Sequence, residues 1–140
     1  MATKRPLLLA IVLCALAGCG SDDNISRALQ IVIPGEIPTI QNGTLYLSLW
    51  NYVGDVGTTP ATLLDVEQTA FSHTAGQATA IILSVHGKPQ SGRKHYLTVE
   101  GCVAGSNGAT SVFNAFVLSG QQTMAIVVPS AAPSACAAAH

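Results

Sequence analysis

The sequence has little charge and few aromatic side chains. Charged residues occupy 9% of the 140 positions and aromatic residues 5%. With six basic side chains against seven acidic ones, the chain lacks the strongly basic face that nucleic acids require. Beyond residue 18 no window shows the three-and-four apolar spacing of a helix, and the scarcity of Glu, Lys and Arg agrees. We therefore expect no nucleic-acid partner and a fold without helices.

Recognisable catalytic motifs are missing too. The chain has no Gly-x-Ser-x-Gly segment, no Walker loop and no dinucleotide-binding glycine pattern. Asp65 and Glu67 share a strand face, as a glycosidase pair could, but surface carboxylates explain them more simply. Four histidines are present, none at the short spacing of metal ligands: His73, His86, His95 and His140. His86 and His95 could meet only across a hairpin. We expect no enzymatic activity, no cofactor and no bound metal.

The sequence also lacks an apolar run long enough to cross a bilayer as a helix, which takes about 20 residues. Its apolar segment, residues 7–16, follows Lys4 and Arg5 and ends in Leu-Ala-Gly-Cys. This arrangement resembles the signal peptide and lipobox of a bacterial lipoprotein precursor. The resemblance implies cleavage after residue 18, a diacylglycerol on the Cys19 sulfur and an acyl chain on its amino group. Gly20, in place of Asp, resembles the signal for sorting to the periplasmic face of the outer membrane.

If residues 1–18 are a signal peptide, the remaining 122 residues are enough for one domain with its own core. They carry four basic and seven acidic side chains, a net charge of −3. Residues 19–27 are polar and short, as expected of the lipidated cysteine and a tether. We assign residues 28–129 to the folded domain and residues 130–140 to an Ala-rich tail.

Two cysteines remain once the signal segment and Cys19 are set aside. In an oxidising envelope compartment, an even number favours a disulfide between Cys102 and Cys136. A metal site would need more soft ligands than this pair offers. Cys102 has the same strand parity as Glu100, so a regular strand places it on the outer face, where the disulfide would clip the tail over the sheet. A bulge at Gly101 would turn it inward.

Apolar residues alternate with period two between clusters of Gly, Pro, Asn and Asp, which is typical of strands. The expected strands cover residues 29–33, 44–53, 62–69, 78–85, 95–103, 111–118 and 123–128. About seven short strands with a turn signal every ten residues or so predict an all-β domain, a single antiparallel β-sandwich. A closed barrel is the alternative.

The second expected strand carries the clearest candidate for a binding surface. Its leucines point to one face, so Tyr46, Trp50 and Tyr52 point to the other. If the leucine face is the core, the aromatic row lines an outer face, and such rows often mark binding sites. Alternatively the polarity is inverted, or a loop or the tail covers the row.

A basic loop follows the fourth expected strand and contains Lys88, Arg93 and Lys94. These are three of the four basic side chains beyond the signal segment. The simplest interpretation is a solvated hairpin end. The alternative is a contact patch for an acidic partner or headgroup.

Four segments carry a resemblance to a known family: residues 45–53, Thr-Pro-Ala-Thr at 59–62, Val-Glu-Gln-Thr at 66–69 and Arg-Lys-His-Tyr-Leu-Thr-Val at 93–99. They resemble the YbaY/YscW-type lipoprotein family, which includes pilotins of type III secretion. The resemblance implies a lipid-anchored β-sandwich that is not an enzyme and assists a membrane-assembling envelope protein at the outer membrane. A rival hypothesis is a small-ligand or glycan-binding lipoprotein that uses the aromatic strand face. A third is a passive coat lipoprotein without a specific partner.

Overall fold

The computed structural model describes residues 25–54, 61–88, 92–118, 125–130 and 133–137. These residues form eight strands: β1 (Ile25–Ile33), β2 (Ile40–Tyr52), β3 (Thr62–His73), β4 (Thr79–Gly87), β5 (Lys94–Gly105), β6 (Gly108–Leu118), β7 (Ala125–Val127) and β8 (Ser134–Ala135). The prediction of an all-β sandwich is confirmed. No helix occurs in the described ranges, so none there could cross a membrane.

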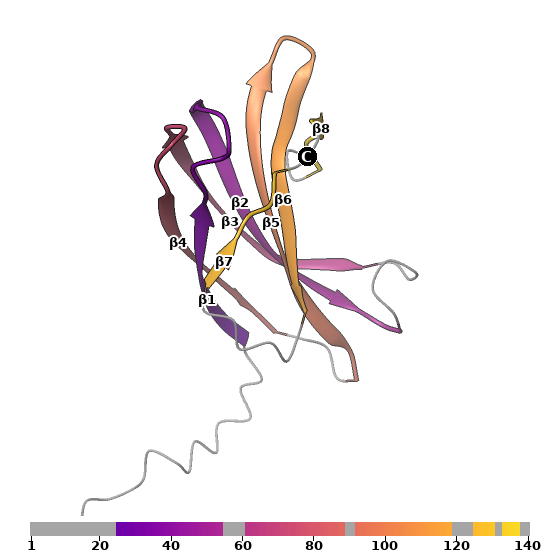
Figure 1. The fold of residues 1–140 in the computed structure, drawn as a ribbon. Helices are drawn as coiled ribbons and strands as arrows, with labels where there is room; N and C mark the ends of the chain where they lie inside the picture. The colour runs from indigo at the N-terminus through magenta and orange to yellow at the C-terminus, as the bar shows by residue number, and fades with distance from the viewer. Residues whose placement is uncertain (1–24, 55–60, 89–91, 119–124, 131–132, 138–140) are drawn as a thin grey trace, which may run out of the picture.

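Two sheets form the layers of the sandwich (Figure 1). The smaller sheet has the strand order β4-β1-β7, and the larger has the order β3-β2-β5-β6-β8. The hairpin of β5 and β6 rises beyond the end of the three-stranded sheet, as Figure 1 shows. One sheet is therefore larger than the other, and part of its inner face extends past the facing layer.

The core lies between the sheets and follows the period-two pattern of the sequence. Along β2 every second residue from Leu45 to Leu49 is fully buried, and the intervening positions point away from the core. The opposing sheet contributes Leu29, Ile31 and Ile33 from β1. Burying such side chains stabilises the fold by about 1.5 to 3 kcal/mol each. The leucine face of β2 is therefore the core face.

The pairing of β7 differs from the fully antiparallel arrangement that the sequence predicts. β7 pairs with β1 in parallel, with Ile31 opposite Ile126. β6 belongs to the larger sheet and β7 to the smaller one. The chain therefore changes sheets between them, and β7 runs beside β1 in the same direction as β1. Strands also extend past the expected domain limits at both ends, because β1 begins at Ile25 and β8 pairs with β6.

The bulge between β5 and β6 lies on β6 and not at Gly101. β5 pairs with β2 without interruption, whereas on the β6 side Gly101 is opposite Phe113 and Cys102 is opposite Ser111. Val112 is the extra residue. The ring of Phe113 is fully buried and occupies the space where a Gly101 side chain would be. Gly101 therefore lets a core phenylalanine lie directly on the backbone of β5.

We expect Gly101→Ala to destabilise the protein by about 1 to 3 kcal/mol, because its Cβ would lie within 2.7 Å of three Phe113 ring atoms in a packed core. Urea unfolding of the variant measures the loss. The double variant Gly101→Ala/Phe113→Leu removes the clash, so its loss should be smaller than the sum of the two single losses. Strict additivity would contradict this account.

Candidate functional site

The outer face of the five-stranded sheet collects the polar and aromatic residues that alternate with the core. The register aligns them in cross-strand rows. Each row runs from β3 through β2 and β5 onto β6. The three rows are Leu63, Trp50, Tyr96 and Leu118; Val66, Ser48, Thr98 and Phe116; and Gln68, Tyr46, Glu100 and Asn114. Neighbours within a row are close enough for direct side-chain contact.

Three aromatic side chains form one end of this face. Trp50 and Tyr96 lie with nearly parallel rings, 12° apart in plane and 6.3 Å between centroids. Tyr52 meets Tyr96 edge to face at 5.3 Å. The Trp50 indole N–H donates a hydrogen bond of 2.8 Å to the Thr98 hydroxyl, which fixes the orientation of the ring. Trp50 and Tyr96 therefore form a rigid aromatic wall.

The aromatic row of β2 is not uniformly exposed. Tyr46 and Trp50 are half-buried, but Tyr52 is only 6% exposed. Of the two alternatives for this row, an exposed face or a covered one, Tyr52 follows the second. Tyr96 of β5 takes its place beside Trp50.

A groove of about 250 Å³ lies next to the aromatic wall. Four residues with polar side chains contribute to its lining: Ser48, Thr98, Glu100 and Asn114. Ser48 is 4% and Glu100 9% exposed, which is unusual for polar side chains on the outer face of a sheet. The sequence indicated the strand parity of Glu100 but did not predict the groove, because strand order and register bring Tyr96 and Glu100 beside Trp50 and Tyr46.

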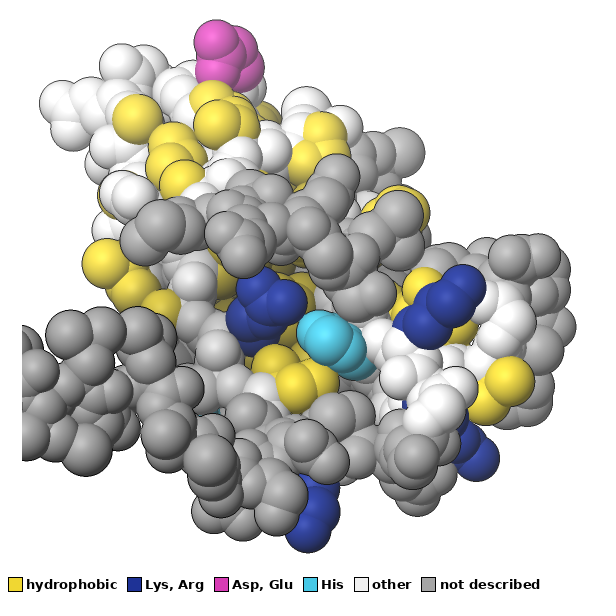
Figure 2. Space-filling model, turned by 90° about the horizontal axis from the view of Figure 1, so that it is seen from below, with side chains coloured by type: hydrophobic (Ala, Val, Ile, Leu, Met, Phe, Trp, Pro, Cys, Tyr) yellow, Lys and Arg dark blue, Asp and Glu magenta, His cyan; other side chains and the backbone are white. Residues whose placement is uncertain are grey.

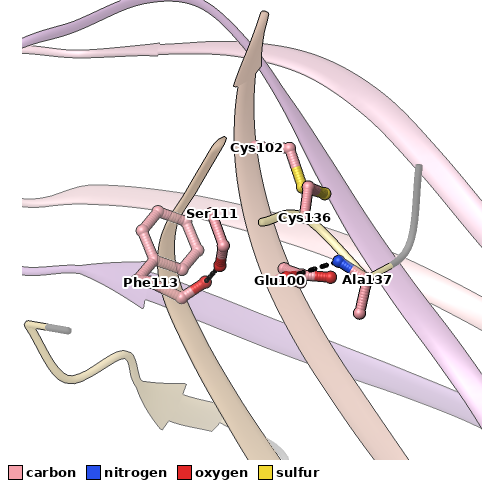
Figure 3. The surroundings of a disulfide bond; sticks show 6 residues. All are labelled: Glu100, Cys102, Ser111, Phe113, Cys136 and Ala137. Carbon is pink, nitrogen blue, oxygen red and sulfur yellow. Dashed lines mark hydrogen bonds between the residues drawn. A yellow bond between two sulfur atoms is a disulfide. The ribbon is translucent and has the colours of Figure 1, made fainter. Parts of the chain in front are cut away.

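The C-terminal segment closes the other side of the groove. Cys102 and Cys136 are at disulfide distance, with Cα atoms 5.9 Å apart, and the bond sits on the outer face of β5 (Figure 3). The Ala137 N–H donates to a Glu100 carboxylate oxygen at 3.1 Å. Ala137 therefore becomes a wall of the groove. The parity expectation for Cys102 agrees with this geometry.

A larger, apolar groove of about 500 Å³ lies on the inner side of the same sheet, where the hairpin of β5 and β6 extends past the smaller sheet. Its wall includes Ile37 and Pro38 from the connection between β1 and β2, Val103 from β5, Val112 from the bulge, and Pro133. None of its lining residues is charged. The sequence did not predict this groove, because it results from the unequal size of the two sheets.

The basic residues of the expected contact patch are all solvent-exposed: Lys88, Arg93 and Lys94. Lys94 begins β5 and lies opposite Tyr52, at the aromatic end of the outer face. Figure 2, seen from this end of the sandwich, shows basic side chains spread over the surface and not gathered in one cluster. None of these three residues lines the groove beside Trp50.

Asn51 enters the core at the end of the sandwich where β1 begins, and His95 lies beside it half-buried. Asn51 is fully buried with neither side-chain polar atom hydrogen-bonded, and it lies opposite His95, whose Nε2 is also buried without a partner. Burial, and then the charge of Arg27, lower the pKa of His95 below its usual 6.5. Figure 2 shows one histidine beside a basic side chain near the centre of this end.

Of the other candidate ligands, His86 is solvent-exposed, His73 is engaged structurally, and the rest lie outside the described residues. His73 is buried, with its ring nitrogens 2.9 Å from the Thr79 hydroxyl and 3.0 Å from the Ile37 carbonyl oxygen. In the described ranges, one trio of potential metal ligands comes together, Glu100, Cys102 and Cys136, but the two sulfurs bond to each other and offer no thiolates. The lipidation candidate Cys19 lies outside the described residues, as does His140.

Removing the disulfide should release the wall at Ala137. Because the bond closes a loop of 34 residues, the variant Cys102→Ser/Cys136→Ser should lose about 3 to 4 kcal/mol of unfolding free energy. Urea unfolding measures the loss, and hydrogen exchange at the Ala137 amide should accelerate. A thiol reductant should reproduce both effects in the wild type and change nothing in the variant. Two free thiols found by non-reducing mass spectrometry would rule the bond out.

The environment of His95 predicts a pH dependence of stability. Since the folded state holds the pKa of His95 below 6.5, the unfolded chain takes up this proton more readily, and acidification through this range destabilises the fold. NMR titration should give a His95 pKa below 6.5 that rises in Arg27→Gln. His95→Gln should remove this part of the pH dependence. A His95 pKa at or above 6.5 in the wild type would contradict the assignment.

The comparisons with known proteins are limited to the fold. No protein-family model matches the sequence, and no curated protein matches it. Among solved structures, the chain is similar to an alternative pilotin from the type II secretion system of Vibrio cholerae. The match has 12% identity and a TM-score of 0.54, and it covers 78% of this chain and 98% of that protein. The YbaY/YscW assignment stays a prediction, and the chain shares the fold of a pilotin over almost that protein's whole length.

Proposed function

We propose that this protein is a lipid-anchored envelope protein that acts, without catalysis, as a pilotin-like assembly factor at the periplasmic face of the outer membrane. The observation that carries the proposal is the fold shared with a pilotin, covering 98% of that protein. The lipobox-like segment ending in Cys19 supports the anchor. The partner is an envelope protein of a secretion machine.

The apolar groove supports this role as the docking surface for the partner. It is uncharged and about 500 Å³ in volume, so it suits an apolar segment of another chain. β1 begins at the opposite end of the sandwich and its nine residues span roughly 27 Å. An anchor preceding β1 would leave the groove on the end of the domain away from the membrane, accessible to a periplasmic partner.

The anchor is tested by Cys19→Ser in the producing bacterium, with Cys14→Ser as the matched control. We expect the first variant in the soluble fraction and the second in the outer membrane, since only Cys19 accepts lipid and two or more chains give stable attachment. In the Cys19→Ser strain, less of the secretion machine's outer-membrane subunit should be recovered in the outer-membrane fraction. A Cys19→Ser protein that stays in the membrane would show the anchor to be wrong.

Docking is tested separately with Thr110→Glu, which introduces a charge into the wall of the apolar groove. The matched control is Ala80→Glu, at an exposed position of the other sheet. We expect Thr110→Glu to keep its membrane location while recovery of the outer-membrane subunit drops severalfold, because burying an unpaired carboxylate is costly. Full recovery of the outer-membrane subunit in a strain that does not produce this lipoprotein would refute the assembly role.

A further inference from the structure

We propose that the polar groove on the outer face of the five-stranded sheet is a binding site for a neutral saccharide. This function is additional to the assembly role and uses the opposite face of β5. Glu100 points into the polar groove, whereas Val103 lines the apolar groove. The two sites can therefore be tested and can fail independently.

The aromatic wall supplies the platform that a sugar ring needs. Sugar rings present patches of C–H groups that pack on the faces of aromatic rings, and Trp and Tyr combine such a face with a polar edge. Trp50 and Tyr96 both line the groove, and the hydrogen bond from the indole to Thr98 holds the larger ring in place. A ligand would therefore meet a surface that is already ordered.

The lining supplies groups that match hydroxyls. The Ser48 and Thr98 hydroxyls can donate and accept, the Glu100 carboxylate accepts, and the Asn114 amide does both. Sugar hydroxyls also donate and accept, so the two surfaces are complementary. None of the groove's lining residues is Lys or Arg. With Glu100 as the charged lining residue, the site favours a neutral sugar over an acidic one.

The size of the groove and its borders indicate how the ligand is arranged. A volume of about 250 Å³ is below the usual range for drug-sized ligands and suits a single ring. Ala137, held next to Cys136, closes one side. Phe116 and Val66 continue the Thr98 row in both directions and are 59% and 43% exposed. They give neighbouring rings of an oligosaccharide apolar surface to rest on.

The chain contains a single tryptophan, Trp50, so intrinsic fluorescence reports directly on this groove. The full-length protein, in a detergent without a sugar headgroup, is titrated with maltotriose, cellotriose and the trimer of N-acetylglucosamine, up to about 10 mM. We expect a saturable change in Trp50 emission with at least one of them. No saturable change with any of the three would overturn the proposal.

Variants locate the binding site while leaving the reporter in place. Asn114→Ala should weaken binding about tenfold, because a sugar hydroxyl loses its partner. Gln30→Ala removes an exposed side-chain amide from the outer face of the other sheet and should change nothing. Equal affinity of Asn114→Ala and the wild type, or equal binding of the anionic probe trigalacturonate, would overturn the proposal. The assembly role is read from Cys19→Ser and Thr110→Glu, so failure of either function is distinguishable.

Discussion

Burial of the leucine face of β2 is the constraint on which the rest of this structure depends. Leu45, Leu47 and Leu49 belong to the same buried core as the inward side chains of β1. A strand cannot shift by one residue without turning every side chain to the other face. Ser48 and Trp50 must therefore point outward, and β5 follows the same alternation because it pairs with β2 without a bulge. The polar groove thus results from the packing of the core.

The unequal size of the two sheets creates the second surface. Three strands cover one side of the core and five form the other, and the hairpin of β5 and β6 continues past the smaller sheet. At this point the inner face keeps its apolar residues, such as Val103, without a facing strand. The bulge at Val112 adds another apolar side chain there. A sandwich with equal layers would have buried this groove in its core.

The C-terminal segment turns an ordinary sheet face into a concave one. Without the link between Cys102 and Cys136, residues with so many alanines and prolines would have few contacts to order them. With it, β8 pairs with β6 and the Ala137 amide reaches Glu100. A disulfide at the edge of the groove fits an oxidising compartment, in agreement with the proposed envelope location.

The sequence by itself determined the fold class and the two faces of β2, because apolar and polar or aromatic residues alternate along that strand, as Leu49 and Trp50 do. It also indicated the outward parity of Cys102. Only the tertiary structure decided which strands are neighbours and in what register. Hence the placement of Tyr96 beside Trp50, the burial of Tyr52 and the parallel pairing of β7 could not be derived. Alternation specifies a face, whereas neighbours depend on long-range pairing, which local sequence does not encode.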